Sequence, residues 1–262
     1  MQNLLQAAIN ASLKAGEEIL KVYQTDLLVE KKEDHSPLTL ADKNANAVIC
    51  EILKKTGIPI LSEEGKNISY DERKDWNRIW IVDPLDGTKE FVKRNGEFTV
   101  NIALVENKIP VLGVIYVPVT RELFFGEQRL GCFKFENFNR IISSLDEFIS
   151  QSRRLPQKSE VEKFTLVASR SHITRETMDY IEKMKAIHGE VNIISAGSSL
   201  KFCLVAEGKA NVYPRFGPTM EWDTAAGQAI VQSMGKKVTD NGTRQTLLYN
   251  KENLLNGNFI AE

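Results

Sequence analysis

The sequence predicts an α/β protein, with an α+β part toward its N-terminus and an α/β part toward its C-terminus. In the first part, two amphipathic helical segments precede a run of β-rich segments joined by turn residues. From about residue 163 onward, β-rich and helical segments alternate. The stretch 143–163 between them is polar and lacks a strong period. We therefore expect subdomains at 1–155 and 156–262, with the functional cleft between them.

Composition narrows the classes of function. The formal net charge of the 262 residues is -1, so bulk charge predicts neither nucleic-acid nor membrane affinity. No apolar run is long enough to span a bilayer, and the first residues are too polar for a secretory signal. Three scattered cysteines are typical of reduced thiols. We expect a cytoplasmic protein without a transmembrane segment or nucleic-acid partner; contact with the inner face of a membrane and the oligomeric state stay open.

The first part begins with two helices. The segment 1–23 predicts a surface helix, because apolar residues recur at helical spacing: Leu5, Ile9, Leu13, Leu20 and Tyr23. The polar stretch "EKKEDHSPLT" at 30–39 predicts a loop. A second amphipathic helix follows, with one apolar side formed by Ala45, Val48, Ile49, Ile52 and Leu53.

Strands follow these helices. "IPILSEEG" at 58–65 and "NRIWIVD" at 77–83 each predict a buried strand that ends in acidic residues. The stretch 97–118 predicts an antiparallel pair around the turn at 106–108, and 121–136 predicts further short strands. In the second part, strands are expected at 163–169, 191–195 and 210–214. Helices are expected at 174–187, 198–208 and 221–235.

Carboxylates gather where these elements end, as Glu63 with Glu64, Asp83 with Asp86, and Asp223. Magnesium prefers oxygen ligands and binds through a few carboxylates plus substrate phosphate. Pro84 fixes the backbone after Asp83, which could direct the Leu85 carbonyl as a further oxygen ligand. Gly87 permits close approach of a ligand, and 88–91 can begin a helix whose N-terminus favours phosphate. Spacing alone does not show that these groups converge.

Each acidic motif also has a purely structural interpretation. "DPLDGT" alone could be a turn with a helix cap, "LSEEG" a solvated loop, and "EWDTAAG" a capped helix. Asp83 and Asp86 are separated by two residues rather than one, which disfavours a phospho-aspartyl mechanism. The spacing does not fit an EF-hand loop, and no P-loop or dinucleotide-binding motif is present.

Several motifs together resemble a known family. "DPLDGT" at 83–88, "LSEEG" at 61–65 and "WDTAAG" at 222–227 resemble the metal-binding motifs of the inositol monophosphatase superfamily. Longer stretches are similar to its CysQ-type 3'(2'),5'-bisphosphate nucleotidases: "SPLTLAD" at 36–42, "TKEFVKRNGEFTVNIAL" at 88–104, "SRSH" at 169–172, "GSSLKFCLVAEG" at 197–208 and "YPRFGPTMEWDTAAG" at 213–227. The similarity extends from the first helix to Gly235, except for residues 130–165, and does not include the C-terminal tail.

The resemblance implies a layered α-β-α-β-α fold and a hydrolase. The expected reaction is lithium-sensitive, magnesium-dependent removal of the 3'-phosphate from 3'-phosphoadenosine 5'-phosphate, giving AMP, by water that two or three metal ions activate. Residues 1–155 would form a metal-binding subdomain and 156–262 a nucleotide-binding one. The expected partner is this small bisphosphate nucleotide.

The resemblance also implies roles for individual residues. The metal ligands would be Glu63, Asp83, the Leu85 carbonyl, Asp86 and Asp223. Asp42 and Thr88, together with Glu63, would serve catalysis, with Asp42 and Thr88 at the nucleophilic water. Substrate would be bound by Glu63, Leu85, Asp86, Gly87, Thr88, His172, Ser198, Lys201, Arg215 and Asp223. Of these, His172 corresponds to a histidine near the adenosine.

The 5'-phosphate would be held by Ser198, Lys201 and Arg215. Ser198 and Lys201 are three apart on the predicted helix, and a cationic pair at a helix N-terminus suits a phosphate. Without the resemblance, Lys201 and Arg215 would read as solvated charges. His172 could equally cap the helix that follows it.

Other points stay open. Glu221 departs from the pattern and could either add a carboxylate near the metals or point to solvent. His35 and His188 receive no catalytic role. Alternative functions are an inositol monophosphatase or sugar bisphosphatase of the same superfamily, and a catalytically silent metal- or anion-binding module.

Overall fold

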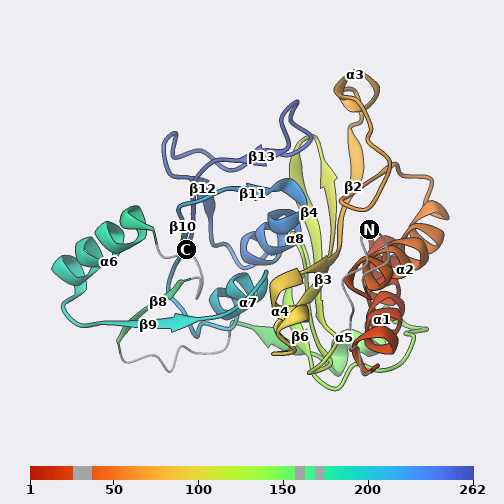
Figure 1. The fold of residues 1–262 in the computed structure, drawn as a ribbon, viewed down its shortest axis with the longest axis horizontal. Helices are drawn as coiled ribbons and strands as arrows, with labels where there is room; N and C mark the ends of the chain where they lie inside the picture. The colour runs from red at the N-terminus through yellow and green to blue at the C-terminus, as the bar shows by residue number, and fades with distance from the viewer. Residues whose placement is uncertain (26–36, 157–162, 169–173) are drawn as a thin grey trace.

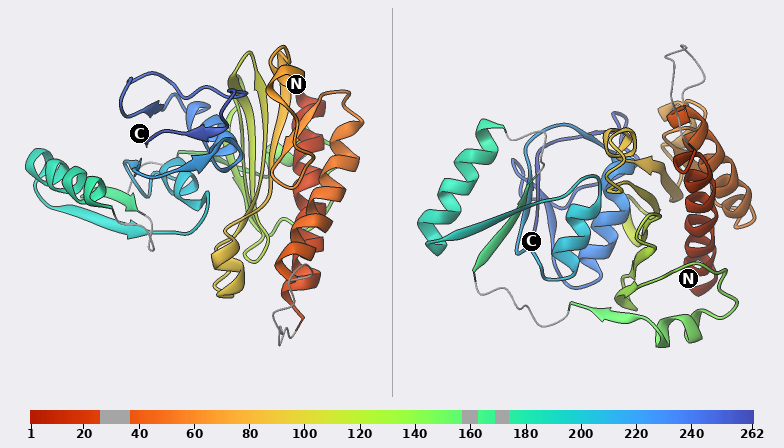
Figure 2. Two further views of the ribbon diagram at one scale, coloured as in Figure 1. Left: turned by 45° about the horizontal axis from the view of Figure 1, so that its top comes forward. Right: turned by 60° about the horizontal axis from the view of Figure 1, so that its bottom comes forward.

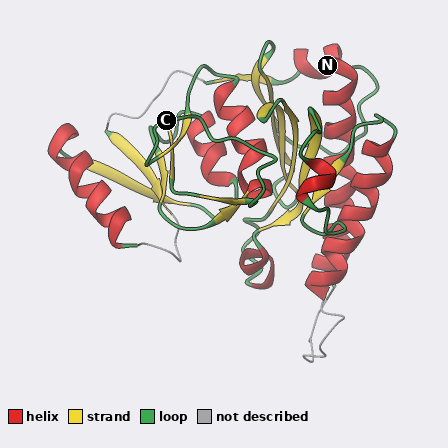
Figure 3. Cartoon of the chain, turned by 90° about the horizontal axis from the view of Figure 1, so that it is seen from above, coloured by secondary structure: helices red, strands yellow, loops and turns green. Residues whose placement is uncertain are grey.

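Helix and sheet alternate in five layers through the molecule (Figure 1). This computed structural model describes residues 1–25, 37–156, 163–168 and 174–262. Helices α1 and α2 cover one face of a large sheet, and α7 and α8 cover the other. A second group of strands follows, and α6 packs on its outer side (Figure 3). The layered α-β-α-β-α fold implied by the resemblance is therefore confirmed.

The outer layer consists of α1 (Gln2–Tyr23) and α2 (Pro37–Lys54). The predicted apolar side of α1 faces the sheet, where Leu5, Ile9 and Leu13 are buried. The loop predicted at 30–39 extends too far toward the C-terminus, because α2 already begins at Pro37. Proline is tolerated in the first turn of a helix, where its missing N–H would have no partner in any case.

Within the described residues, the large sheet has seven strands in sequence order. They are β1 (Ile60–Ser62), β2 (Arg78–Asp86), β3 (Thr99–Glu106), β4 (Ile109–Val117), β5 (Glu122–Glu127), β6 (Gly131–Phe135) and β7 (Arg153–Leu155). Strands β1 and β2 run parallel, and every later neighbour is antiparallel. The predicted hairpin at 97–118 is thus confirmed as β3 and β4. Two short helices, α3 (Tyr70–Arg73) and α4 (Thr88–Val92), flank β2.

The described part of the polar stretch, 143–156, contains regular structure that its sequence does not predict. It contains α5 (Leu145–Ser150) and the edge strand β7. Ser144 caps α5 by accepting a hydrogen bond from the Glu147 N–H, while Leu145 and Phe148 are buried. These elements are too short to leave a period in the sequence, which explains why the pattern missed them.

The second part contains two kinds of strand pairing. Strands β8 (Phe164–Ala168) and β9 (Val191–Ser195) are parallel and are joined through α6 (Arg175–His188), as predicted. Strands β10 (Tyr213–Arg215), β14 (Phe259–Ala261) and β12 (Val238–Asp240) form an antiparallel sheet with β14 in its centre. The sequence did not predict that sheet. It also did not predict a second antiparallel pair, which consists of β11 (Thr219–Met220) and β13 (Leu255–Asn256).

Helices α7 (Leu200–Ala206) and α8 (Glu221–Gln232) lie between the sheets (Figure 2). Glycines allow this close packing. A Cβ on Gly113 of β4 would lie 2.3 Å from the Ala226 carbonyl oxygen of α8, and one on Gly227 would lie 2.2 Å from Phe202 Cδ2 of α7. Residues from both parts of the chain therefore share one core. No helix in the described ranges has both the length and the apolarity of a membrane span.

Candidate active site

A bulge in β2 directs two aspartates to the same side of the sheet. Asp83 pairs with Asn101 of β3, whereas Asp86 pairs with Thr99, so two residues of β2 oppose one of β3. In a regular strand, side chains three apart point to opposite faces. Because of the extra residue, Asp83 and Asp86 both face α8. Pro84, which lacks an N–H, is accommodated at the bulge, and the Leu85 N–H donates to Asp83 Oδ1 at 3.1 Å.

A buried polar network holds Asp86. Its Oδ2 accepts a hydrogen bond from the Ser199 N–H at 2.6 Å and another from Asn101 Nδ2 at 3.3 Å. The Ser199 hydroxyl donates to Asn101 Oδ1 at 2.8 Å and lies 2.8 Å from Thr99 Oγ1. This network connects β3 to the turn before α7. Asp86 is thereby fixed between the large sheet and the predicted nucleotide-binding residues.

Further carboxylates lie around this position. Asp83 is 1% exposed, and its burial together with the charges of Asp86 and Glu63 raises its pKa well above the usual range. Burial also raises the pKa of Asp223 to about 7, with Asp86 adding to the effect. The pKa of Asp42 is raised to about 8 by burial and then by the charges of Glu64 and Glu63. The acidic motifs that the sequence left unconnected therefore converge in space.

Helix α2 contributes to this convergence through two residues one turn apart. Asp42 supplies its carboxylate, while Asn46 binds the end of β1. The Ser62 hydroxyl donates to Asn46 Oδ1 at 2.7 Å, and Asn46 Nδ2 donates to the Glu64 carbonyl at 3.3 Å. Asn46 therefore sets where Glu63 and Glu64 lie relative to Asp42.

The donor set fits hard divalent cations. Buried carboxylates of like charge are costly unless a cation compensates them. Among the described residues, no three acidic, histidine or cysteine side chains are close enough to ligate a single ion on their own. Magnesium does not require this, since it usually binds through one or two carboxylates, waters and substrate phosphate. The site therefore suits ions that are completed by water and substrate rather than an all-protein cage.

The turn after β2 places α4 at the edge of this cluster. Gly87 has φ of 97°, and a Cβ there would lie 3.0 Å from Ser198 Cβ. Glycine is needed both for this backbone conformation and for the close approach. Thr88 follows as an exposed first residue of α4. No hydrogen bond joins Thr88 to Asp42 in the described structure, so their joint action on a water molecule stays a prediction.

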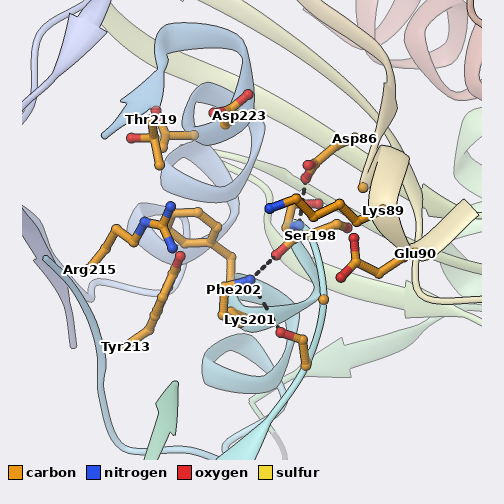
Figure 4. Close-up of a pocket in the computed structure, with 15 residues that line it drawn as sticks. Asp86, Lys89, Glu90, Ser198, Lys201, Phe202, Tyr213, Arg215, Thr219 and Asp223 are labelled. Atoms are coloured by element: carbon orange, nitrogen blue, oxygen red, sulfur yellow. Dashed lines mark hydrogen bonds between the residues drawn. The ribbon is translucent and has the colours of Figure 1, made fainter. Parts of the chain in front are cut away.

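A pocket next to the carboxylates carries basic residues (Figure 4). Asp86 and Asp223 line it together with Ser198, Lys201 and Arg215. The Arg215 guanidinium points into the pocket, and its Nε has no hydrogen-bond partner among the described residues. A buried N–H without a partner is costly, which makes Arg215 well suited to receive an anion.

Lys201 lies deeper than Arg215. Its ammonium donates to the carbonyls of Ser198 at 2.6 Å and Ala196 at 3.3 Å. Burial lowers the pKa of Lys201 to about 8, although the nearby Asp86 acts in the opposite direction. The prediction that Ser198 and Lys201 share a helical face is wrong. Ser198 has φ of 44° and lies in the turn before α7, which begins at Leu200.

The remaining predicted residues have different outcomes. His172 and His35 lie outside the described residues. His188 ends α6, one residue beyond the helix predicted at 174–187, and its ring is stacked on that of Phe164 with the ring centroids 4.0 Å apart. Sequence reasoning missed the roles of Asn46, Thr99 and Asn101. For the last two a signal was present, because they are polar residues at alternate positions of an otherwise apolar strand.

Comparisons with known proteins agree with this geometry. The profile of the Inositol monophosphatase family matches residues 1–261. The 3'(2'),5'-bisphosphate nucleotidase CysQ of Salmonella typhimurium is 43% identical over 261 residues, covering 98% of each chain. The crystal structure of CysQ from Bacteroides thetaiotaomicron superposes with a TM-score of 0.96 at 53% identity, covering 100% of this chain and 97% of that one. An inositol monophosphatase from Anabaena gives a TM-score of 0.70 at 29% identity, covering 99% and 90%.

Proposed function

Because the chain belongs to the inositol monophosphatase family, we propose that it is a magnesium-dependent 3'(2'),5'-bisphosphate nucleotidase. The observation that carries this proposal is the pocket in which Asp86 and Asp223 stand next to Lys201 and Arg215. A bisphosphate needs two anion sites, one for the phosphate that is cleaved and one for the phosphate that stays. Carboxylates with magnesium suit the first, and buried cations suit the second.

The acidic cluster would hold the phosphate that is cleaved. Glu63, Asp83, the Leu85 carbonyl, Asp86 and Asp223 would bind two or three magnesium ions. Magnesium, when bound, neutralises phosphate charge and makes water a better nucleophile. Thr88 would position the attacking water, and the Asp42 carboxylate would orient the Thr88 hydroxyl. Gly87 leaves room for the phosphate to approach the backbone.

The basic side of the pocket would hold the 5'-phosphate. Arg215 offers its unpaired Nε, and Lys201 and Ser198 line the same pocket. Lys201 has two of its three ammonium protons engaged with carbonyls, so we expect a single bond from it to phosphate. His172 would contact the adenosine. Water would attack the phosphorus of the 3'-phosphate, the bond from phosphorus to the 3'-oxygen would break, and that oxygen would take up a proton from water, which gives AMP and inorganic phosphate.

The relatives also bear on the alternative. Named nucleotidases match this chain at higher identity and higher structural similarity than the inositol monophosphatase does. Inositol monophosphate has one phosphate group, so the Arg215 Nε and the third ammonium proton of Lys201 would have no second phosphate to bind.

The test is phosphate release from 3'-phosphoadenosine 5'-phosphate with magnesium, with and without lithium. We expect lithium-sensitive release and AMP as the nucleotide product. Hydrolysis of inositol monophosphate at a much higher kcat/KM than the nucleotide would refute the proposal. Folded protein that binds magnesium but hydrolyses neither substrate would instead indicate the silent binding module.

A further inference from the structure

Glu221 is the first residue of α8 and lies two residues before Asp223. The sequence left two possibilities for its side chain, a position near the metals or a position in solvent. The structure shows neither, because Glu221 is 0% exposed and its carboxylate binds the segment 248–256. We call this segment the 248–256 loop.

The Glu221 carboxylate accepts three hydrogen bonds from the loop. Its Oε2 accepts from the Asn250 N–H at 2.6 Å, and its Oε1 accepts from the Lys251 N–H at 3.0 Å. Lys251 Nζ adds a bond to Oε1 at 2.8 Å. The same ammonium donates to the Leu248 carbonyl and to Asn256 Oδ1. A buried carboxylate that is paired in this way fixes the loop tightly against α8.

The loop in turn holds the first turn of α8 at several points. The Glu221 N–H donates to the Leu254 carbonyl at 3.0 Å. Asn256 Nδ2 donates to the Met220 carbonyl at 3.0 Å and to Thr224 Oγ1 at 2.9 Å. Hydrogen bonds to the loop therefore flank Asp223 on both sides along the chain.

The direction of the Asp223 side chain depends on this first turn. Asp223 Oδ2 accepts a hydrogen bond from the Met220 N–H at 2.8 Å, so one oxygen is committed to the helix N-terminus. The geometry of this turn therefore sets where the rest of the Asp223 carboxylate points. A change in that geometry would shift Asp223 relative to Asp86.

The loop also binds the opposite acidic segment through Arg73, which is 2% exposed. Arg73 Nη1 donates to Asn250 Oδ1 at 2.8 Å and to the Lys251 carbonyl at 2.7 Å. In return, Asn250 Nδ2 donates to the Arg73 carbonyl at 2.7 Å. Arg73 lies on the stretch that leads from Glu63 to β2, so the loop connects both acidic segments.

We propose that Glu221 is a positioning residue, which sets the place of Asp223 in the metal site by fixing the 248–256 loop between α8 and Arg73. The inference rests on the proposed magnesium-dependent hydrolysis. It assigns no contact between Glu221 and metal or substrate. It differs from a purely structural role because it requires metal binding to change even where the fold is kept.

The test compares Glu221→Ala with the unmodified enzyme in two measurements. Calorimetric titration with Mg²⁺ reports binding without turnover, and phosphate release reports the Mg²⁺ requirement and the KM for nucleotide. Residues that orient metal ligands typically contribute ten- to a hundredfold to metal affinity. We expect Mg²⁺ affinity to fall about tenfold or more, with a matching rise in the Mg²⁺ requirement. The KM for nucleotide at saturating Mg²⁺ should stay near its original value.

Glu127→Ala is the matched control. Glu127 is also a buried carboxylate that accepts from two main-chain N–H groups, those of Arg129 and Leu130, but it faces the α1 side of the large sheet. We expect it to lower the melting temperature while leaving Mg²⁺ affinity unchanged. Glu221→Gln serves if Glu221→Ala does not fold, because it keeps the side-chain shape but leaves one main-chain N–H without an acceptor. It should weaken Mg²⁺ binding in the same direction.

The outcomes are distinguishable. Folded Glu221 variants with the Mg²⁺ affinity and requirement of the unmodified enzyme would overturn the positioning role alone. Equal losses of Mg²⁺ affinity in Glu221→Ala and Glu127→Ala would also overturn it, since general destabilisation would then be the cause. An unmodified enzyme that neither binds Mg²⁺ nor releases phosphate would overturn the proposed function together with this inference.

Discussion

Replacing Asp42 with asparagine should make the metal-free protein more stable and the enzyme less active. The Asp42 side chain is 7% exposed, and no described residue donates a hydrogen bond to it. Burial and the neighbouring charges of Glu64 and Glu63 raise its pKa from 3.8 to about 8. The ionised carboxylate is therefore unfavourable in the folded protein without metal, and a neutral amide of the same shape avoids this cost.

The size of the gain depends on pH. Between pH 3.8 and about 8, the folded state holds a proton on Asp42 that the unfolded chain has released, so stability falls as pH rises. The interval from pH 5 to 8 is about three pH units, which at about 1.4 kcal/mol per unit gives an upper bound of about 4 kcal/mol for the loss of stability. Because water and side chains relax around a buried charge, we expect roughly half of this, about 2 kcal/mol. For a chain of this size that corresponds to about 4–8 °C in melting temperature.

Thermal unfolding with a chelator at pH 5 and pH 8 would measure this effect. Asp42→Asn should melt higher than the unmodified protein at pH 8, with a much smaller difference at pH 5. Phosphate release with Mg²⁺ should fall about a hundredfold, if Asp42 orients the nucleophilic water through Thr88. Asp179→Asn on the exposed side of α6 is a suitable control and should change neither quantity. A melting temperature of Asp42→Asn that is unchanged or lower at pH 8 would refute the electrostatic reasoning.

Three further predictions concern the site and its support. Asp83→Asn should abolish most Mg²⁺-dependent phosphate release while the circular dichroism spectrum is retained; normal turnover would remove Asp83 from the metal site. Lys201→Ala and Arg215→Ala should raise the KM for the bisphosphate nucleotide more than for a nucleotide without the 5'-phosphate. Equal increases for both substrates would contradict that role. Gly227→Ala should lower the free energy of unfolding by about 1–3 kcal/mol, because the added Cβ would overlap Phe202. An unchanged free energy of unfolding, measured with denaturant, would contradict this packing.

Sequence periodicity predicted the elements whose pattern is long. Helix α1 and the β3–β4 hairpin were found because apolar residues recur at the helical period or in β-rich runs around a turn. The elements that were missed are short or depend on partners far away in the chain. Strand β14 has three residues, and only its neighbours β10 and β12 make it a central strand.

The site was predictable in composition but not in arrangement. The acidic motifs identified Asp83, Asp86 and Asp223, and the structure brings their carboxylates within range of one another's charge. The start of α7 could not be located from the sequence, because Ser198 adopts a left-handed backbone conformation that the surrounding residues do not indicate. Nor did any local pattern reveal that Glu221 binds a loop some thirty residues later in the chain.

The bulge in β2 has a consequence for how this protein tolerates change in length. Removing Leu85 would leave Asp83 and Asp86 two residues apart in a regular strand, so both would still face α8, but the buried Leu85 side chain would be lost from the core on the α1 side. Every acidic residue would still be present in such a variant, and the hydrophobic pattern up to Val82 would be intact. The extra residue of the bulge therefore anchors the motif in the core on the α1 side, while both aspartates stay on the opposite face. A deletion there should be more damaging than most single substitutions in the same strand.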